Sequence, residues 1–421
     1  MKKKIFQESV WSFSSKGVGI LLFFLNSSLL AHLLGKEVFG QWIVLFSLFS
    51  LCHFFTLFGV NDYLRKELVQ SHSKEYRKIV FPFFVVRGVV TLFSGILLFF
   101  FVDGTSIFSP VFISIILTFL IPFLLLYGIL DFLHQIFFGL HRIKYSFFLS
   151  CIEQISFFSF LFCFSLIQEI TLESVFIFHL LSFFLAVVFG AFFFLYQTRA
   201  EKNTPLLLFD RKTYFSLFFH SFPYFVVQAG TYFFSYIDIL LLGIVASPVY
   251  AGVYGIAKNV VSKIPHINTA LSLSFSPVFS NIARKDAGFQ EKKNILLHYV
   301  FLNIIILVCI SIGILLFSDI FVRLIWGNTY QEASFFLRLL IPYMISFSLL
   351  SSFGAILDYN NAIRKRAIIY ISSSVLFLLL FFVLKGKLHA ILISLSLSCV
   401  VASFAHFILL FQKIFNKDTQ N

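Results

Sequence analysis

Twelve long apolar stretches divide this 421-residue chain, and they limit its fold more than any other feature. An α-helix needs about 20 mostly apolar residues to cross the hydrocarbon core of a bilayer. The stretches cover residues 10–34, 41–60, 79–102, 109–134, 146–167, 174–197, 214–243, 248–271, 294–317, 331–356, 367–384 and 388–411. We therefore expect an all-α polytopic membrane protein with about 12 transmembrane helices.

The composition excludes a soluble protein. Hydrophobic residues make up 59% of the chain and charged residues only 12%, whereas soluble domains carry about 25% charged residues. Phe, Leu and Ile fill the stretches without the alternating polar residues of a β-barrel strand, which favours a helical bundle. The sequence contains no metal-ligand cluster, nucleotide-binding loop or hydrolase motif. We expect no cofactor, no resident metal and no enzymatic activity.

The positive charges predict the orientation in the membrane. Of the 32 Lys and Arg residues, 23 fall in the loops and termini of one side and four in the loops of the other. Because Lys and Arg collect on the cytoplasmic side, we expect both termini in the cytoplasm. The same distribution accounts for the net charge of +13 without a nucleic-acid partner.

The chain divides into two halves of six stretches each. A basic, proline-containing loop at residues 198–213 separates them. We predict an N-terminal six-helix lobe over residues 1–200 and a C-terminal six-helix lobe over residues 201–421. Both halves begin on the cytoplasmic side, so any internal repeat is parallel. At an offset of 212 residues a few identities align, among them Ser9 with Ser221 and Gly40 with Gly252.

Polar residues form a stripe on one helical face in the first and seventh stretches. The first stripe contains Ser12, Ser15, Lys16, Gly19 and Asn26. The second contains Tyr224, Gln228, Thr231, Ser235 and Asp238. Small and hydroxylated residues also allow close helix packing in membranes, which is the alternative explanation. A charged residue in each stripe favours a hydrated face.

The eighth stretch carries the strongest polar signal. Lys258, Asn259 and Lys263 share one helical face with Ser262 and His266. A Lys at the bilayer centre costs about 2.5–3.5 kcal/mol, so it should face water, a partner or a ligand. The alternative is a cytoplasmic helix end, which Pro265 would favour.

Other stretches also contain ionisable residues. Arg87 and Arg338 lie about 12 Å inside theirs, where they either line a cavity, reach the interface or pair with an acid such as Asp131. Asp131 and Glu153 lie near predicted cytoplasmic ends, where they either reach water or serve a buried function.

Several short motifs resemble those of a known family in their order along the chain. They are Ser9–Trp11, Leu33–Gly40, Gly59–Lys66, Phe275–Val278, Trp326–Ala333 and Leu339–Pro342. The chain thus resembles the bacterial O-antigen and polysaccharide flippases of the multidrug/oligosaccharidyl-lipid/polysaccharide exporter superfamily. The high phenylalanine content, 64 residues, exceeds what the resemblance predicts.

The resemblance implies a fold and a function. The fold is two six-helix lobes around a central cavity lined by the first, second, seventh and eighth spans. The function is translocation of an undecaprenyl-pyrophosphate-linked oligosaccharide, such as an O-antigen, lipopolysaccharide or capsule repeat unit. Movement runs from the cytoplasmic to the periplasmic leaflet of the inner membrane by alternating access. Expected partners are this lipid-linked substrate, membrane lipid, H⁺ or Na⁺ as coupling ion, and a downstream polymerase.

In such a cavity, fixed cations would meet the diphosphate, and amides and aromatic rings would meet the sugars. The expected substrate-binding residues are Lys16, Asn26, Arg87, Tyr224, Gln228, Lys258, Asn259, Lys263 and Arg338, with Tyr232 a further aromatic candidate. Asp238 is the acid of the two stripes and the candidate coupling residue, unless it lies near the periplasmic end and is merely solvated.

Three other functions stay open at the level of the sequence. A cation-coupled drug exporter of the same superfamily would need an acid-rich cavity, whereas the stripes hold mainly lysines. A membrane-embedded polysaccharide polymerase or glycosyltransferase would need a larger outside loop. A peptidoglycan-precursor flippase would have fourteen spans.

Overall fold

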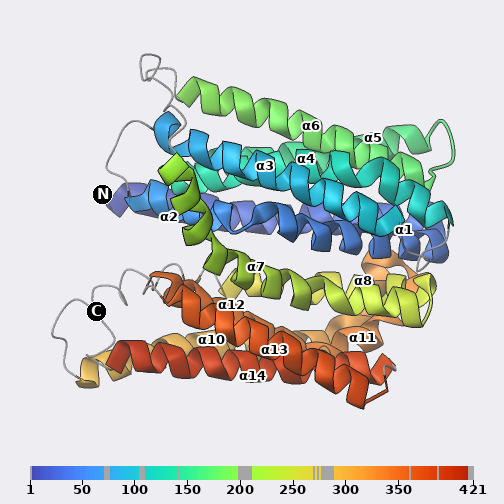
Figure 1. Cartoon of the computed structure of the whole chain (residues 1–421). Helices are drawn as coiled ribbons and strands as arrows, with labels where there is room; N and C mark the ends of the chain where they lie inside the picture. The colour runs from blue at the N-terminus through green and yellow to red at the C-terminus, as the bar shows by residue number, and fades with distance from the viewer. Residues whose placement is uncertain are drawn as a thin grey trace. The chain divides into compact units, whose positions relative to one another are not determined.

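The computed structural model is helical throughout the residues that it describes. These are residues 2–70, 76–103, 110–140, 142–197, 211–268, 271–272, 275, 289–359, 362–385 and 388–415. Of residues 2–16 only the backbone is described. The chain forms two compact units, Met1–Tyr232 and Phe233–Asn421, and Figure 1 shows the helices of each.

Unit 1 contains the first six spans and the first part of the seventh. Its helices are α1 (Lys2–Leu57), α2 (Val60–Gln70), α3 (Tyr76–Asp103), α4 (Pro110–Gly139), α5 (Ile143–Ser165), α6 (Leu172–Gln197) and the beginning of α7 (Arg211–Val245). α1 packs along α5, and α6 packs against α4 and α5. α2 packs against α3 and α4.

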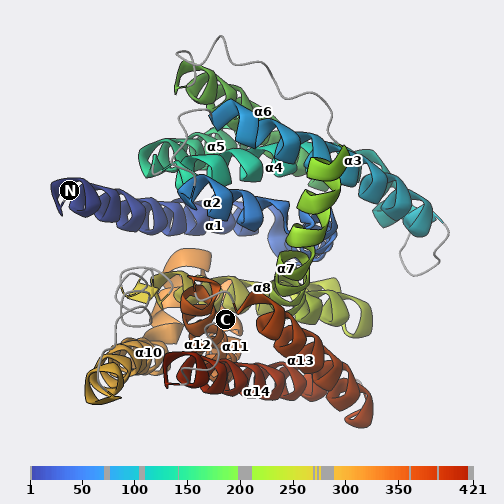
Figure 2. The same cartoon turned by 60° about the vertical axis from the view of Figure 1, so that its left-hand side comes forward.

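Unit 2 contains the rest of α7 and the helices that follow. They are α8 (Pro248–Val261), α10 (Phe289–Trp326), α11 (Ala333–Leu339), α12 (Ile341–Tyr359), α13 (Ile363–Val383) and α14 (Leu388–Phe415). α14 packs against both α12 and α13, and α11 packs against α8 (Figure 2).

Each of the twelve expected spans overlaps a described helix, and the prediction of an all-α polytopic membrane protein is confirmed. The expected span 248–271 extends beyond α8, and the span 331–356 covers both α11 and α12. The first two spans share α1, which Gly35 interrupts with a non-helical conformation at φ 70° and ψ 173°. A residue with a side chain adopts such a positive φ only with strain, so glycine suits this break. Nine described helices are long and apolar enough to cross a membrane, and α1 accounts for two spans.

The two units divide inside α7, at Tyr232, whereas we expected the division in the loop at residues 198–213. The reason is a close approach in unit 1, where the end of α1 meets the first half of α7. A Cβ atom on Gly59 would lie 2.1 Å from the backbone oxygen of Ser221 and 2.4 Å from the backbone nitrogen of Phe225. Beside it, the ring of Phe58 stacks on Phe218 and Phe225, with centroids 4.3 and 5.0 Å apart. These contacts attach the first half of α7 to unit 1.

We predict that Gly59→Ala destabilises the protein. Gly59 has φ +67°, which alone costs a residue with a side chain about 1–3 kcal/mol. The new methyl group would also collide with the backbone of α7. The midpoint of thermal unfolding in detergent should fall, whereas Gly19→Ala, in a helix with nothing within 4 Å of its added Cβ, should leave it unchanged. Equal midpoints for both variants would contradict the close approach.

Candidate functional site

A buried ion pair joins α7 and α8 in unit 2. The ammonium of Lys258, in the last turn of α8, lies 2.7 Å from Oδ2 of Asp238 on α7. Their side chains are 1% and 0% exposed. Ser247, between the two helices, caps α8 by accepting a hydrogen bond from the backbone of Tyr250. α7 and α8 form an antiparallel hairpin around this short turn. Residues a similar number of positions before and after Ser247 therefore lie opposite each other.

The ammonium of Lys258 has a partner for each of its hydrogens. Besides Asp238, it donates to the backbone oxygen of Phe234 at 3.0 Å and lies 3.6 Å from the ring centroid of Tyr343. The hydroxyl of Tyr343 donates to the same Phe234 oxygen at 3.1 Å. Lys258 is therefore a saturated cation that ties α8 to α7 and α12.

Asp238 is less completely satisfied than its partner. The hydroxyl of Tyr254 donates to Oδ2, the same oxygen that Lys258 contacts. Oδ1 is buried and has no hydrogen-bond partner within the described part of the chain. A buried carboxylate oxygen without a partner is costly, and it is where a proton or a small cation would bind. The alternative that Asp238 is merely solvated is wrong, because its side chain is fully buried.

A second charged cluster lies in unit 1, where Asn61 on α2 links Arg87 on α3 to Asp131 on α4. Arg87 donates to the amide oxygen of Asn61. The amide nitrogen of Asn61 in turn donates to Oδ2 of Asp131 at 2.5 Å. Arg87 Nη2 lies 3.9 Å from the same carboxylate oxygen. Arg87 and Asp131 therefore form an Arg–Asp pair, which was one of the possibilities left open by the sequence, and Arg87 is only 4% exposed.

The remaining polar candidates of unit 1 lie in separate places. The amide of Asn26 donates to the side chain of Gln154 at 2.9 Å. Gln228 donates to Asp62 at 2.8 Å, and Tyr224, one helical turn before it, is buried. The side chain of Lys16 lies outside the described residues.

In unit 2, α8 ends at Val261, so Lys263 lies in the turn that follows it. Asn259 and Lys263 are both half-buried. Arg338, in the last turn of α11, bonds to Ser318 and Asp319 of α10. Of the predicted binding residues in this unit, α8 and its following turn thus bring together Lys258, Asn259 and Lys263.

Two further sets of buried polar residues have no counterpart among the residues predicted from the sequence. His53 in α1 lies 3.9 Å from Asp131 and belongs to the cluster of unit 1. In unit 2, Arg366 bonds to Asp358 and lies 3.3 Å from His406. Arg366 directly precedes the expected span at residues 367–384, and nothing in its neighbours along the chain indicates that it is buried.

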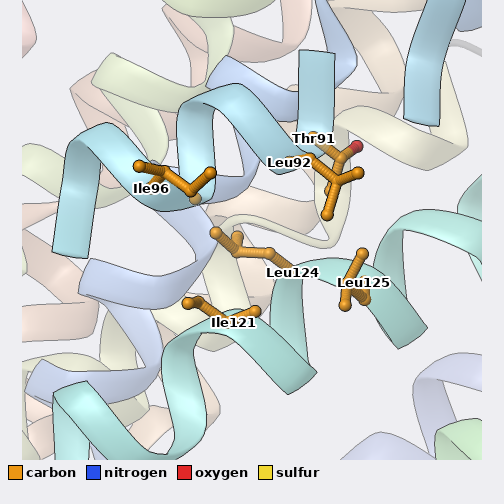
Figure 3. A pocket seen from close by; sticks show the side chains of 7 residues that line it. Thr91, Leu92, Ile96, Ile121, Leu124 and Leu125 are labelled. Carbon is orange, nitrogen blue, oxygen red and sulfur yellow. The ribbon is translucent and has the colours of Figure 1, made fainter. Parts of the chain in front are cut away.

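A pocket between α3 and α4 has a different character (Figure 3). It is lined by Thr91, Leu92, Gly95, Ile96, Ile121, Leu124 and Leu125. No charged group contributes to its wall, so it suits a hydrocarbon chain and offers nothing to a charged headgroup.

Comparison with known proteins gives one family and one fold. The sequence model of the family described as polysaccharide biosynthesis protein matches residues 5–283. No curated protein matches the chain.

Solved transporter structures share the fold at low sequence identity. The eukaryotic MATE transporter AtDTX14 aligns with a TM-score of 0.71 at 16% identity, over 99% of both chains. The MATE multidrug transporter DinF-BH, solved as a complex, aligns with a TM-score of 0.71 at 13% identity, over 99% of this chain and 97% of that one. The lipid II flippase MurJ, in an inward closed conformation, aligns with a TM-score of 0.65 at 15% identity, over 98% of this chain and 90% of that one.

We predict that Lys258 and Asp238 stabilise the protein as a pair. Replacing one partner of a buried ion pair leaves the other charge uncompensated and costs about 3–5 kcal/mol. Lys258→Met should therefore lower the thermal unfolding midpoint strongly, and adding Asp238→Asn should recover much of the loss. A double-mutant cycle measures the coupling. If the stability losses of the two single variants simply add in the double variant, the two side chains do not stabilise the protein as a pair.

Proposed function

Because the chain belongs to the polysaccharide biosynthesis protein family, we propose that it is a flippase for a lipid-linked oligosaccharide. The substrate is an undecaprenyl-pyrophosphate-linked repeat unit of O-antigen, lipopolysaccharide or capsule. It moves from the cytoplasmic to the periplasmic leaflet of the bacterial inner membrane by alternating access, without chemical change. The family match over residues 5–283, in a chain whose fold is shared by membrane transporters, is the observation that carries this proposal.

The chemistry of the substrate supports the proposal. A diphosphate cannot cross about 30 Å of hydrocarbon unaided, because removing its charge from water costs too much. Fixed cations lower that cost, and a Lys ammonium binds phosphate as a point charge. Lys16, Lys258, Lys263, Arg87 and Arg338 are the proposed cations.

Two of the proposed cations, Lys258 and Lys263, lie in the last turn of α8 and in the turn that follows it. Lys258 must first exchange Asp238 for phosphate, since its hydrogens are all engaged. Lys263, half-buried in the turn after α8, is a further candidate for contact with the phosphate. Asn26, Tyr224, Gln228 and Asn259 are the proposed partners of the sugars, while the polyprenyl chain stays in lipid. A downstream polymerase would remove the product.

Drug export is the second candidate function. Several MATE transporter structures share the fold, and three of them are described as multidrug or multidrug resistance transporters. A buried acid with a free oxygen, as at Asp238, is also what a cation exporter requires. The family match favours the polysaccharide pathway over this alternative.

We predict that Lys263→Ala abolishes or strongly reduces surface polysaccharide in the host cell while the protein still accumulates in the membrane. Lys263→Arg should retain partial export, because charge matters more than shape at a phosphate contact. Lys293→Ala, an exposed lysine at the start of α10, is the matched control and should export normally. Normal export by both Lys258→Ala and Lys263→Ala would rule out a cationic site in this region.

We further propose that Asp238 couples transport to a proton or sodium gradient. Its unpaired Oδ1 can accept the ion while Lys258 holds Oδ2. In membrane vesicles, Asp238→Asn should transport at a rate that no longer responds to an imposed gradient. If this variant keeps its full dependence on the gradient, Asp238 does not couple transport, and its role is the ion pair with Lys258.

A further inference from the structure

The pocket between α3 and α4 lies at the middle of two membrane spans. Thr91 is at the centre of the expected span at residues 79–102, and Ile121 is at the centre of the span at residues 109–134. The other lining residues follow within about one and a half turns of each helix. Because each span crosses about 30 Å of hydrocarbon, the pocket lies near the midplane of the bilayer in the predicted topology.

The pocket opens on a surface of unit 1 that is apolar. Leu92 and Ile96, which line it, are 55% and 52% exposed, whereas Gly95 and Leu124 are buried (Figure 3). Phe93, beside Leu92 on α3, is also exposed. At the depth of the midplane an exposed apolar surface contacts lipid chains. The pocket is therefore continuous with the lipid-facing surface of the protein.

The size and the walls of the pocket indicate a hydrocarbon occupant. It encloses about 100 Å³, and none of the described residues that line it is charged. Thr91 is the one lining residue with a polar side chain. Apolar cavities of this kind stay dry and bind small apolar molecules. An empty hollow would also deprive its walls of dispersion contacts, which a hydrocarbon segment would restore.

Gly95 leaves the space that the pocket occupies. A Cβ atom built on Gly95 would have one described heavy atom within 4 Å outside its own helix turn, Cγ1 of Ile121 at 3.8 Å. This is an ordinary van der Waals distance, so an added methyl group would fit without displacing α4. A longer side chain at the same position would extend into the pocket and fill it.

The depth of the pocket favours a polyprenyl chain over the acyl chain of a phospholipid. An acyl chain spans one leaflet, about half of the 30 Å core, so only its end reaches the midplane. A polyprenyl chain is longer than a leaflet, and its internal isoprene units reach the midplane from a headgroup at either surface. Each isoprene unit also carries a methyl branch, which suits a compact hollow better than a straight methylene chain does.

We propose that this pocket binds an isoprene segment of the polyprenyl chain of the substrate. The inference rests on the proposed function, which supplies this chain. The chain stays on the lipid side of the protein, where α3 and α4 hold one segment of it. Because the pocket lies at the midplane, it can hold the chain both before and after the headgroup crosses. The phosphates and sugars make their contacts elsewhere.

The test measures binding of undecaprenyl pyrophosphate to the purified full chain in detergent by native mass spectrometry. Gly95→Leu places a side chain in the pocket. It should lower the affinity for undecaprenyl pyrophosphate about tenfold, because the buried contacts of several methyl and methylene groups are lost. Inorganic pyrophosphate is the second probe, and Gly95→Leu should bind it as the wild type does, since the pocket does not contact the headgroup.

Two further variants control for the substitution itself. Gly88→Leu makes the same change on α3, at a glycine outside the pocket lining with nothing within 4 Å of its added Cβ. It should bind undecaprenyl pyrophosphate as the wild type does. Gly95→Ala adds one methyl group at an ordinary contact distance and should have an affinity between those of the wild type and Gly95→Leu. The thermal unfolding midpoint without ligand shows whether each variant is folded, and Gly95→Ala decides if Gly95→Leu is not.

The outcomes separate this inference from the proposed function. Wild-type affinity for undecaprenyl pyrophosphate in both Gly95 variants, or an equal loss in Gly88→Leu, overturns the pocket and leaves the proposed function standing. Dipalmitoyl phosphatidylglycerol should not displace undecaprenyl pyrophosphate at equal concentration; if it does, a membrane lipid occupies the pocket and the polyprenyl chain does not. Absence of undecaprenyl pyrophosphate binding by the wild type overturns the proposed function, and this inference with it.

Discussion

A charge inside the bilayer is costly unless a partner within the protein neutralises it, and the contacts of the buried polar side chains follow from that constraint. Within the described residues, each buried Lys or Arg lies against an aspartate. The pairs are Arg87–Asp131, Lys258–Asp238 and Arg366–Asp358. Each pair joins two helices that follow one another along the chain, so it stabilises a helical hairpin. The rest of the packing is apolar and largely aromatic, which contributes area but little directional specificity.

The same pairing determines how such a protein can handle an anion. A Lys or Arg that is paired with a carboxylate can bind an anion only when that carboxylate moves away. Anion binding and the position of the carboxylate are therefore linked. In our proposals Asp238 plays this part. Oδ1 of Asp238 has no hydrogen-bond partner among the described residues, so this carboxylate is the less completely satisfied member of its pair. A flippase built on this principle needs no fixed excess of positive charge in its core.

Much of the fold was predictable from the sequence, because apolar length alone determines which segments cross the membrane. Three glycines of the motifs that carry the resemblance, Gly35, Gly59 and Gly327, have positive φ in the structure, a conformation that the sequence alone did not predict. The Lys258–Asp238 pair follows from the short turn at Ser247 once α7 and α8 are treated as a hairpin.

Contacts between distant helices were not predictable. Asn26 with Gln154, and Asn61 with Asp131, join residues 128 and 70 positions apart. Hydrophobic periodicity can show which face of one helix is polar, as it does for Asn26, but it does not reveal which distant helix that face meets. His53 was missed for the same reason, because its partner comes from a different helix and its own span shows no polar stripe.

The central claim is tested most directly by transport in proteoliposomes that contain the purified protein and an undecaprenyl-pyrophosphate-linked oligosaccharide. A membrane-impermeant glycosidase measures the fraction of oligosaccharide exposed on the outer leaflet with time. The account predicts that the protein moves inner-leaflet oligosaccharide to the outside, while liposomes without protein retain it. Failure to expose the oligosaccharide, together with gradient-driven movement of a cationic fluorescent dye by the same preparation, would contradict the account and identify a drug exporter.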